Sequence, residues 1–475
     1  MDDTKVDQQT AAVMEMAQVW PVIDALVGGT LAMRKAGKKL LPQWPKEDDS
    51  SYKERLETAV LFGAFSRTTD VLAAKPFARP LQIEGVSPAI EEFYPNIDME
   101  GTDLHAFCGH AMLACLRYGL HGVLVDVPRA ENVRSKADEK AAGIRPYFTH
   151  YPASSILGWR SNKNAEDGNF LTQLRLKEQI IEEDGPFGEN KVDQVRVLYP
   201  GRWEVWRKAK PLQDGRQLWE IYDSGTTTIE VIPFVFFYGL RDGFGIGKPP
   251  LLELAYMNVE HWQSSSDQQT ILHVARVPVL FAKGMSDDDE IVIGSKAATS
   301  TKNVDAELKY VEHSGAAIEA GRNSIHDLED RMRQTGAELL TERQGEVTAQ
   351  QVNSEDEDNR STLQKITEEF EDSLEYCFKL MALWLGDKSA DPEIQLYKDF
   401  GPSEMDPTVL MGAADRKIVS KQTVREHLMR ADVLTHDLDE GEELKRLGLE
   451  QTDELKLEAQ RQKMAADASD KLAGP

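Results

Sequence analysis

The sequence is poor in cysteine and lacks long apolar runs. Cys108, Cys115 and Cys377 are its only cysteines. They form no CxxC pair and no even-numbered framework, which argues against disulfides and fits a reducing compartment. No apolar run reaches the roughly 18 residues of a membrane span. The first ten residues, MDDTKVDQQT, are acidic and polar, unlike a secretory signal peptide. We therefore expect no membrane partner.

Positive charge is also in short supply. The 475 residues include 55 Lys and Arg against 81 Asp and Glu, a formal net charge of −26. Such a chain is not expected to grip nucleic acid, because phosphate binding needs a positive surface. It could still pass nucleic acid through a repulsive channel, and solubility alone explains the charge equally well. The length is sufficient for two to four domains.

Motifs for catalysis are missing. There is no GxSxG, no HExxH and no convincing Ser, His and Asp arrangement. The GFGIGK stretch at 243–248 lacks phosphate-loop spacing and favours a hinge before a helix. His105 and Cys108 have a spacing that could join them at a metal, but Cys108 and Cys115 lie on an apolar stripe typical of core packing. We predict no catalytic residue, cofactor or metal. A hydrolase that uses paired carboxylates remains an alternative.

Residues 1–240 predict an α+β domain. Helices are expected over 19–34, 52–74 and 103–118, with Val60 facing inward in the second. A buried strand is expected over 122–128. Further strands with short gaps predict an antiparallel meander; these segments are 146–151, 155–159, 170–181, 194–200, 202–208, 217–223 and 226–239.

The C-terminal half predicts long helices around a small β-rich insert. A helix is expected over 251–276, a β-rich insert over 279–320, and a second helix over 323–340 with Ser324 as its cap. A polar break follows. A long helix then ends at Gly386 and could begin as early as Ala349. The tail from Lys388 onward is expected to be helical and charged. The long helix carries an amphipathic stripe of Leu363, Ile366, Phe370, Leu374, Cys377, Met381 and Trp384.

This order of elements resembles that of tailed-bacteriophage portal proteins, in the branch that carries a domain-of-unknown-function label. Three stretches carry the resemblance: WPVIDALVGGTLAMRKAGKKLLP at 20–42, GIGKPPLLELAYMNVEHWQSSSDQQTILHVARVPVLF at 245–281, and IVSKQTVREHLMRADVL at 418–434. The likeness covers roughly residues 15–450 and depends on the ordered set, since no single motif is specific. It implies a non-enzymatic protein that is assembled in the host cytoplasm and becomes part of the virion.

The resemblance implies a portal-type α+β fold with seven parts. They are a wing (1–250), a stem helix (251–276), a clip (277–321), a second stem helix (322–340), a tunnel loop (341–352), a long wing helix (353–387), and a crown with the C-terminal tail (388–475). It further implies a homo-oligomeric ring, dodecameric in the family, at one capsid vertex. Double-stranded DNA would pass through it. Its expected protein partners are the terminase large subunit, the major capsid and scaffolding proteins, and head-completion or tail adaptor proteins.

The same resemblance assigns candidate site residues. The DNA-channel candidates in the tunnel loop are Thr341, Glu342, Arg343, Gln344, Gly345 and Glu346, of which Arg343 is the one cation. The candidates for the core or subunit interface of the long helix are Leu363, Ile366, Phe370, Leu374 and Met381. The candidates for motor or adaptor docking in the clip are Asp287, Asp288, Asp289 and Glu290.

Two simpler interpretations stay open for these residues. The segment 341–346 also suits an ordinary loop between helices. The run 287–290 also suits a solvated turn, because it lacks the calcium-loop pattern. A third hypothesis for the whole chain is a helical adaptor that oligomerises through residues 363–384.

Overall fold

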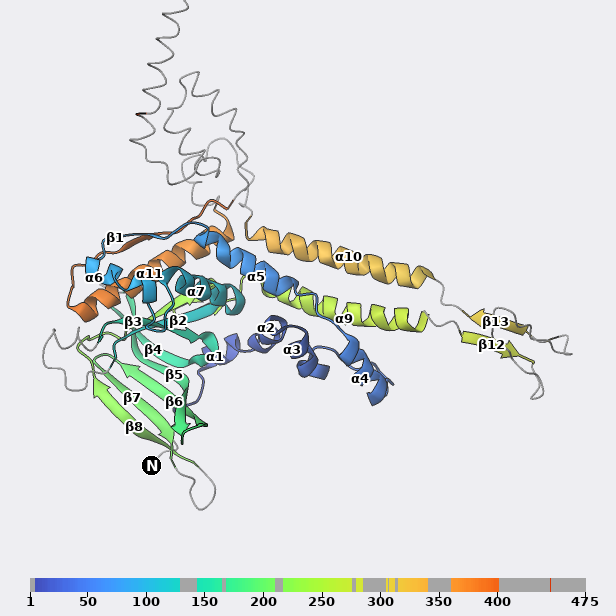
Figure 1. Cartoon of the computed structure of the whole chain (residues 1–475), viewed down its shortest axis with the longest axis horizontal. Coiled ribbons are helices and arrows are strands. Elements are labelled where there is room, and N and C mark those ends of the chain that lie inside the picture. Colours follow the sequence, from blue (N-terminus) through green and yellow to red (C-terminus); the bar gives the residue numbers. More distant parts are fainter. Residues whose placement is uncertain are drawn as a thin grey trace, which may run out of the picture. The chain divides into compact units, whose positions relative to one another are not determined.

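The computed structural model describes residues 5–128, 143–164, 168–209, 217–275, 279–284, 305, 307–311, 315–340, 360–400 and 445. The chain divides into two compact units, Met1–Lys398 and Asp399–Pro475. The first unit mixes α-helices and β-strands (Figure 1), so the α+β prediction holds at this level. No helix within the described ranges is long and apolar enough to cross a membrane.

The N-terminal region consists of short helices. They are α1 (Ala11–Met16), α2 (Trp20–Val27), α3 (Gly29–Ala36), α4 (Asp49–Thr58), α5 (Ala64–Ala74), α6 (Pro88–Glu91) and α7 (Leu104–Tyr118). Helix α7 confirms its prediction, with Asp103 accepting a hydrogen bond from the Ala106 N–H at its start.

Two predicted N-terminal helices are each divided into two, which corrects the prediction. The chain leaves α2 at Gly28 and enters α3 at Gly29, whose φ of +72° suits glycine. Between α4 and α5 the backbone is extended at Ala59, whose carbonyl accepts from the Arg34 side chain. Val60 is 55% exposed, so its predicted inward position is wrong.

A three-stranded antiparallel sheet lies at the centre of the body. Its order is β3 (Tyr147–Pro152), β2 (Leu120–Asp126), β9 (Phe234–Tyr238). Both α7 and α11 (Thr362–Leu385) pack against it. Sequence patterning placed both β3 and β9 in the meander, but both pair with β2 instead, and every residue of the FVFFY sequence of β9 is buried. A strand covered on both faces needs a continuous apolar run rather than alternation, which explains the correction for β9.

Five of the seven predicted meander segments form a five-stranded antiparallel sheet, which confirms the meander in part. Its order follows the chain: β4 (Ile156–Asn164), β5 (Gly168–Asp184), β6 (Gly188–Tyr199), β7 (Arg202–Lys208) and β8 (Trp219–Thr226). Trp159 of β4 contacts Phe236 of β9, with ring centroids 5.4 Å apart. The two sheets therefore meet through large aromatic side chains.

A β-hairpin replaces the predicted hinge at 243–248. Strands β10 (Leu240–Gly243) and β11 (Ile246–Lys248) pair, and Gly245 between them has a φ of +74°. The Lys248 ammonium lies 2.7 Å from the Asp242 carboxylate within the same hairpin. This lysine is therefore part of an ion pair in a turn.

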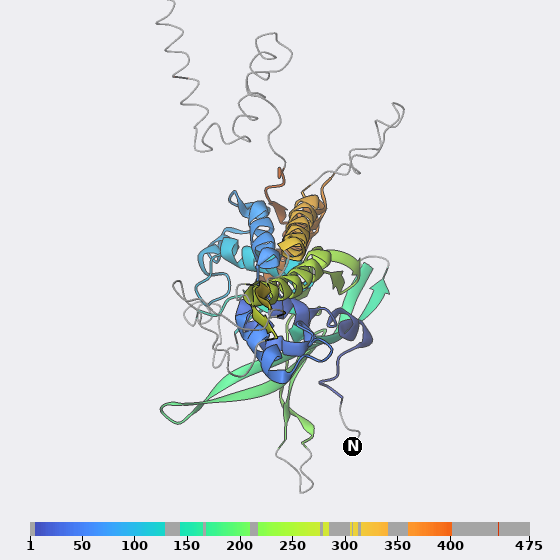
Figure 2. The same cartoon turned by 90° about the vertical axis from the view of Figure 1, so that its right-hand side faces the viewer.

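Helices α9 (Leu252–Ala275) and α10 (Gly315–Glu338) extend together from the body, with β12 (Val279–Lys283) and β13 (Glu307–Val311) paired beyond them (Figures 1 and 2). The prediction of α9 is confirmed. Helix α10 begins at Gly315 rather than 323, so Ser324 lies inside the helix and is not its cap. The rest of the predicted β-rich insert falls outside the described residues.

The long helix is shorter than predicted. Ser361 is its N-cap, and a capping box joins Ser361 with Gln364. Because the backbone of this cap residue is extended, α11 begins at Thr362 and does not reach back to Ala349. After Gly386 the chain forms β14 (Glu393–Gln395), which pairs with β1 (Gln82–Glu84), where a helix was predicted. Most of the tail from 401 onward lies outside the described residues.

Candidate functional site at the root of the α9–α10 helix pair

Helices α9 and α10 form an antiparallel pair. Met257 near the start of α9 contacts Thr335 near the end of α10, and Gln268 near the end of α9 bonds the Ile318 carbonyl near the start of α10. Each helix has 24 residues, which corresponds to about 36 Å at 1.5 Å per residue. The pair therefore separates two features by this distance: the β12–β13 hairpin at one end and the body at the other (Figure 1).

The face of α10 toward α9 repeats in steps of three and four residues. The covered residues in this series are Ile318, Gly321, Ile325, Leu328, Met332 and Thr335, with Leu339 just after the helix; Glu329 and Gly336 are also covered, and Gly336 faces Thr68 of α5. This is the spacing of a coiled-coil seam. At Gly321 an added Cβ would lie 2.2 Å from the Gln268 Oε1 atom, so glycine allows the Gln268 side chain to lie against the helix. The opposite face of α10 is exposed and charged.

Helix α9 is instead covered from several sides and is held by polar contacts. It contacts α2, α4, α5 and α10. The buried Asn258 amide accepts from the Phe65 N–H at 2.9 Å and donates to the Phe62 carbonyl at 2.7 Å. The His261 Nε2 atom lies 3.2 Å from Glu329 of α10. A helix without a single apolar stripe is thus fixed on different sides by different partners.

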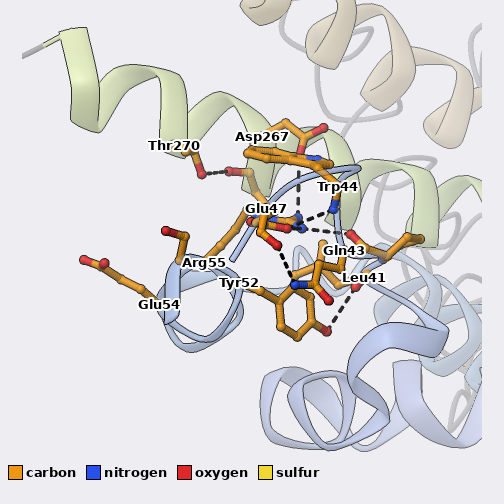
Figure 3. A network of polar contacts seen from close by, with 12 residues as sticks. Leu41, Gln43, Trp44, Glu47, Tyr52, Glu54, Arg55, Asp267 and Thr270 are labelled. Atoms are coloured by element: carbon orange, nitrogen blue, oxygen red, sulfur yellow. Dashed lines mark hydrogen bonds and ion pairs between the residues drawn. The ribbon is translucent and has the colours of Figure 1, made fainter. Parts of the chain in front are cut away.

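A buried ion pair, which we call the Arg55 clamp, joins the α4 region to α9 (Figure 3). The Arg55 guanidinium donates two bonds of 2.8 Å to Glu47 and a third, also 2.8 Å, to the Pro42 carbonyl. Asp267 of α9 lies 3.6 Å away. The Trp44 ring stacks at 4.2 Å from the guanidinium. The side chains of Arg55 and Glu47 are only 3% and 4% exposed.

The clamp shifts the pKa values of its members. The hydrogen bond from Arg55 is the main reason that the pKa of Glu47 lies below its usual value, and the same bond raises the pKa of Arg55. Burial raises the pKa of Asp267, and Arg55 opposes that shift. Two carboxylates around one guanidinium, with the carbonyl and the indole, satisfy a charge that would otherwise be costly to bury.

The end of α10 meets the start of α11 at the body. The Leu363 N–H donates to the Leu339 carbonyl at 3.0 Å. The described residues that flank the segment 341–359 therefore lie close together. A cavity of about 930 Å³ adjoins this junction, between α1, the β10–β11 hairpin and the ends of α9, α10 and α11. Its lining includes Glu15, Asp242, Glu253 and Glu338 beside apolar side chains.

Helix α11 carries the predicted stripe inward. Leu363, Ile366, Phe370, Leu374 and Met381 are at most 2% exposed. The Phe370 ring lies 4.8 Å from the Phe237 ring of β9 and 6.0 Å from the Phe77 ring. These side chains pack in the core of their own chain, so a subunit contact at these positions would require that core to open.

The remaining predicted site residues fall outside the described residues. This applies to 341–346, the channel candidates, and to 287–290, the docking candidates. The Arg55 clamp and Asn258 were not singled out from the sequence. The polar stretch WPKEDD before α4 indicates a turn, but nothing in it indicates that Glu47 pairs with Arg55.

The cysteine candidates behave as core residues, whereas His105 is exposed. Cys108, Cys115 and Cys377 are free and buried, which confirms the core packing predicted for Cys108 and Cys115. Burial raises the pKa of all three thiols. Among the described side chains, no group of three or more His, Cys, Asp and Glu could hold a metal ion.

A family model described as "Domain of unknown function (DUF4055)" matches residues 250–385. The match begins two residues before α9 and ends with the last residue of α11. It thus spans the helix pair, the hairpin and the core helix, which is less than half of the chain. No curated protein matches the chain.

Among solved structures, three similar chains come from gene transfer agent (GTA) particles. One is from the neck of an empty particle computed with C6 symmetry: TM-score 0.40, 12% identity, covering 89% of this chain and 99% of that one. A second is from a native virion, with a TM-score of 0.39 and 13% identity, covering 91% of this chain and 99% of that one. A third is from the neck of a native particle computed with C12 symmetry, with a TM-score of 0.38 and 10% identity, covering 84% of this chain and 98% of that one. At these scores and identities the likenesses alone assign neither fold nor function.

Proposed function

We propose that the chain is a portal subunit: one copy in a ring at a capsid vertex through which double-stranded DNA is packaged and ejected. In this proposal, α9 and α10 form the stem, the β12–β13 hairpin belongs to the clip, α11 is the wing helix, and the crown begins near residue 388. The segment 341–352 is the tunnel loop. The terminase motor supplies the force, because no nucleotide site can be argued from this chain.

One observation carries the proposal. The hydrogen bond from Leu363 to Leu339 brings the residues that flank segment 341–359 together at the root of the helix pair, while the paired strands β12 and β13 lie at the far end of the same pair. The flanks of segment 341–359 and the β12–β13 pair thus lie at opposite ends of antiparallel helices about 36 Å long, which supports the proposal. A channel subunit needs this arrangement to present one segment to DNA and another to the motor or adaptor.

The charge of the helix pair suits a channel that does not hold DNA. Residues 315–340 contain five acidic side chains and three arginines. Each phosphate contact adds binding free energy that translocation must break. A slightly acidic wall limits such contacts, and Arg343 in the tunnel loop would be the cation that touches phosphate.

The first experiment is native mass spectrometry of the purified full chain. The proposal expects a closed ring of about twelve copies of the 53.3 kDa chain, with a central channel under negative stain. A dimer with a deep cleft would reject the proposal and favour the hydrolase.

A second experiment tests the channel role in the virus that encodes the chain. Arg343→Glu is expected to reduce the yield of packaged DNA while leaving ring formation unchanged. Lys53→Glu, an equal charge change on the exposed face of α4, is expected to leave both unchanged. Normal packaging by the Arg343→Glu ring would remove this residue from the channel.

A further inference from the structure

Strand β9 is an edge of the three-stranded sheet. The order of that sheet is β3-β2-β9, so β2 covers one side of β9 and no described strand covers the other. The Val125 N–H bonds the Pro233 carbonyl, and the Gly239 N–H bonds the Gly119 carbonyl. Along an antiparallel strand, the backbone N–H and C=O groups of successive residues point alternately toward the paired strand and away from it. The backbone groups of Phe234, Phe236 and Tyr238 therefore point away from β2, along the free edge.

Few of these outward groups are used within the described residues. The Phe234 N–H donates to the Ile232 carbonyl two residues back. The Phe236 carbonyl accepts from the Ser373 hydroxyl of α11 at 3.2 Å. This bond confirms the direction of the Phe236 carbonyl. The remaining groups provide donors and acceptors for another strand, which is the hazard that edge strands carry.

An apolar groove of about 800 Å³ runs along this edge. One side is the β9 edge with Phe244, the second comes from the start of β5 at Phe170, and the third is α11 with Tyr376. Tyr376 is 44% exposed. The groove thus combines an open backbone edge with aromatic walls, the two features by which strand addition gives affinity and side-chain selectivity.

The rim of the groove is predominantly acidic. Glu230, Glu369 and Asp372 line it, against Arg241 alone. Glu230 and Asp372 are exposed. An occupant with alternating apolar and basic side chains would place apolar groups against the aromatic walls and positive groups beside the rim carboxylates.

We propose that this groove binds an extended, basic segment of a partner protein, which adds to the sheet as a strand beside β9. The site is separate from the helix pair, so the proposal goes beyond the channel role and does not depend on it. Backbone pairing supplies the hydrogen bonds, and the acidic rim selects the charge of the segment.

The test uses the full chain and fluorescent hexapeptides. The first probe alternates valine and lysine. The second has the same side chains, but alternate backbone nitrogens are methylated, which removes donors without changing charge. Because the chain carries a net charge of −26, any basic peptide is attracted to it. Fluorescence anisotropy is expected to show that the methylated probe binds at least roughly tenfold more weakly than the unmethylated probe. Equal binding of both probes would overturn strand addition.

Charge selection is tested with a double variant, Glu230→Lys with Asp372→Lys. It is expected to prefer a valine–glutamate hexapeptide over the valine–lysine one. The control, Glu54→Lys with Glu57→Lys, makes the same net change on the exposed face of α4 and is expected to keep the wild-type preference. An unchanged preference in the groove variant would overturn the proposal. So would self-association that depends on Glu230 and Asp372 in the absence of peptide binding, because the occupant would then be a second copy.

Discussion

Helices α9 and α11 have the same length, but different kinds of contact fix them in the fold. Helix α11 lies on the sheet by one apolar face, including Phe370 and Leu374. Helix α9 has neighbours on several sides and is fixed by the Asn258 amide, by His261 and by the Arg55 clamp. Apolar packing tolerates small shifts, because it has no direction. The polar contacts of α9 fix its position, since a displaced donor or buried charge costs free energy.

The largest effect is expected from a charge in the α11 core. Phe370→Asp removes packing worth about 3–5 kcal/mol and buries an unpaired carboxylate, so the loss should exceed the stability of most domains. We expect no cooperative unfolding transition and little soluble protein. Lys365→Asp, on the exposed face of the same helix, should change the free energy of unfolding by no more than about 0.5 kcal/mol. A normal melting curve for Phe370→Asp would contradict the burial of this face.

The next effect concerns the polar anchor of α9. Arg55→Ala leaves the Glu47 carboxylate buried without its main partner and should cost about 3–5 kcal/mol in urea unfolding. Lys53→Ala removes an exposed ion pair with Glu57 and should cost less than about 1 kcal/mol. Replacing both clamp charges, Arg55→Met with Glu47→Gln, should recover part of the loss. A cost below that of Lys53→Ala would show that the clamp does not hold α9.

The third effect is a pH dependence of the free energy of unfolding, which arises in the three-stranded sheet and not in the helix pair. His121 of β2 and His150 of β3 lie 2.8 Å apart, and the Phe107 ring stacks on His150. Burial is the main cause that lowers the pKa of His121 to about 3 and that of His150 to about 4. In the unfolded chain both titrate near 6.5.

The native state therefore stays neutral at this pair while the unfolded chain takes up protons. Its contribution to stability is complete above about pH 6.5 and falls as the pH drops toward 4, by about 1.4 kcal/mol per pH unit for each histidine. Urea unfolding at pH 7 and pH 5 measures this slope. The double variant His121→Leu with His150→Phe should have a flatter slope than wild type; an identical slope would exclude the pair as its source.

The smallest effect is expected at the seam of the helix pair. Gly321→Ala meets the end of the flexible Gln268 side chain, which can move, while alanine favours the helix by about 1 kcal/mol. The net change in thermal stability should lie within about 1 kcal/mol of zero. Gly119→Ala should cost more, because φ is +79° there and the added Cβ would lie 2.4 Å from the Lys248 backbone. Equal effects would contradict this difference between a side-chain and a backbone neighbour.

The predictions from sequence succeeded where one periodicity governed an element. The stripe of α11, the helix α7 and the alternation of β4 to β8 were all predicted from local patterns. They failed where a distant group decided the backbone. The break between α4 and α5 depends on Arg34 bonding Ala59, and on Asn258, nearly two hundred residues away, bonding Phe62 and Phe65.

The sequence by itself determined the apolar face of α11, the meander, the acidic balance and the order of elements that resembles a portal. Only the tertiary structure decided that β3 and β9 leave the meander for the sheet of β2, that Arg55 pairs with Glu47 beside α9, and that Leu339 bonds Leu363. The physical reason is that periodicity records which side of an element is buried, and one side suffices for a helix on a sheet. Partners across the fold are chosen by geometry, which a local pattern does not contain.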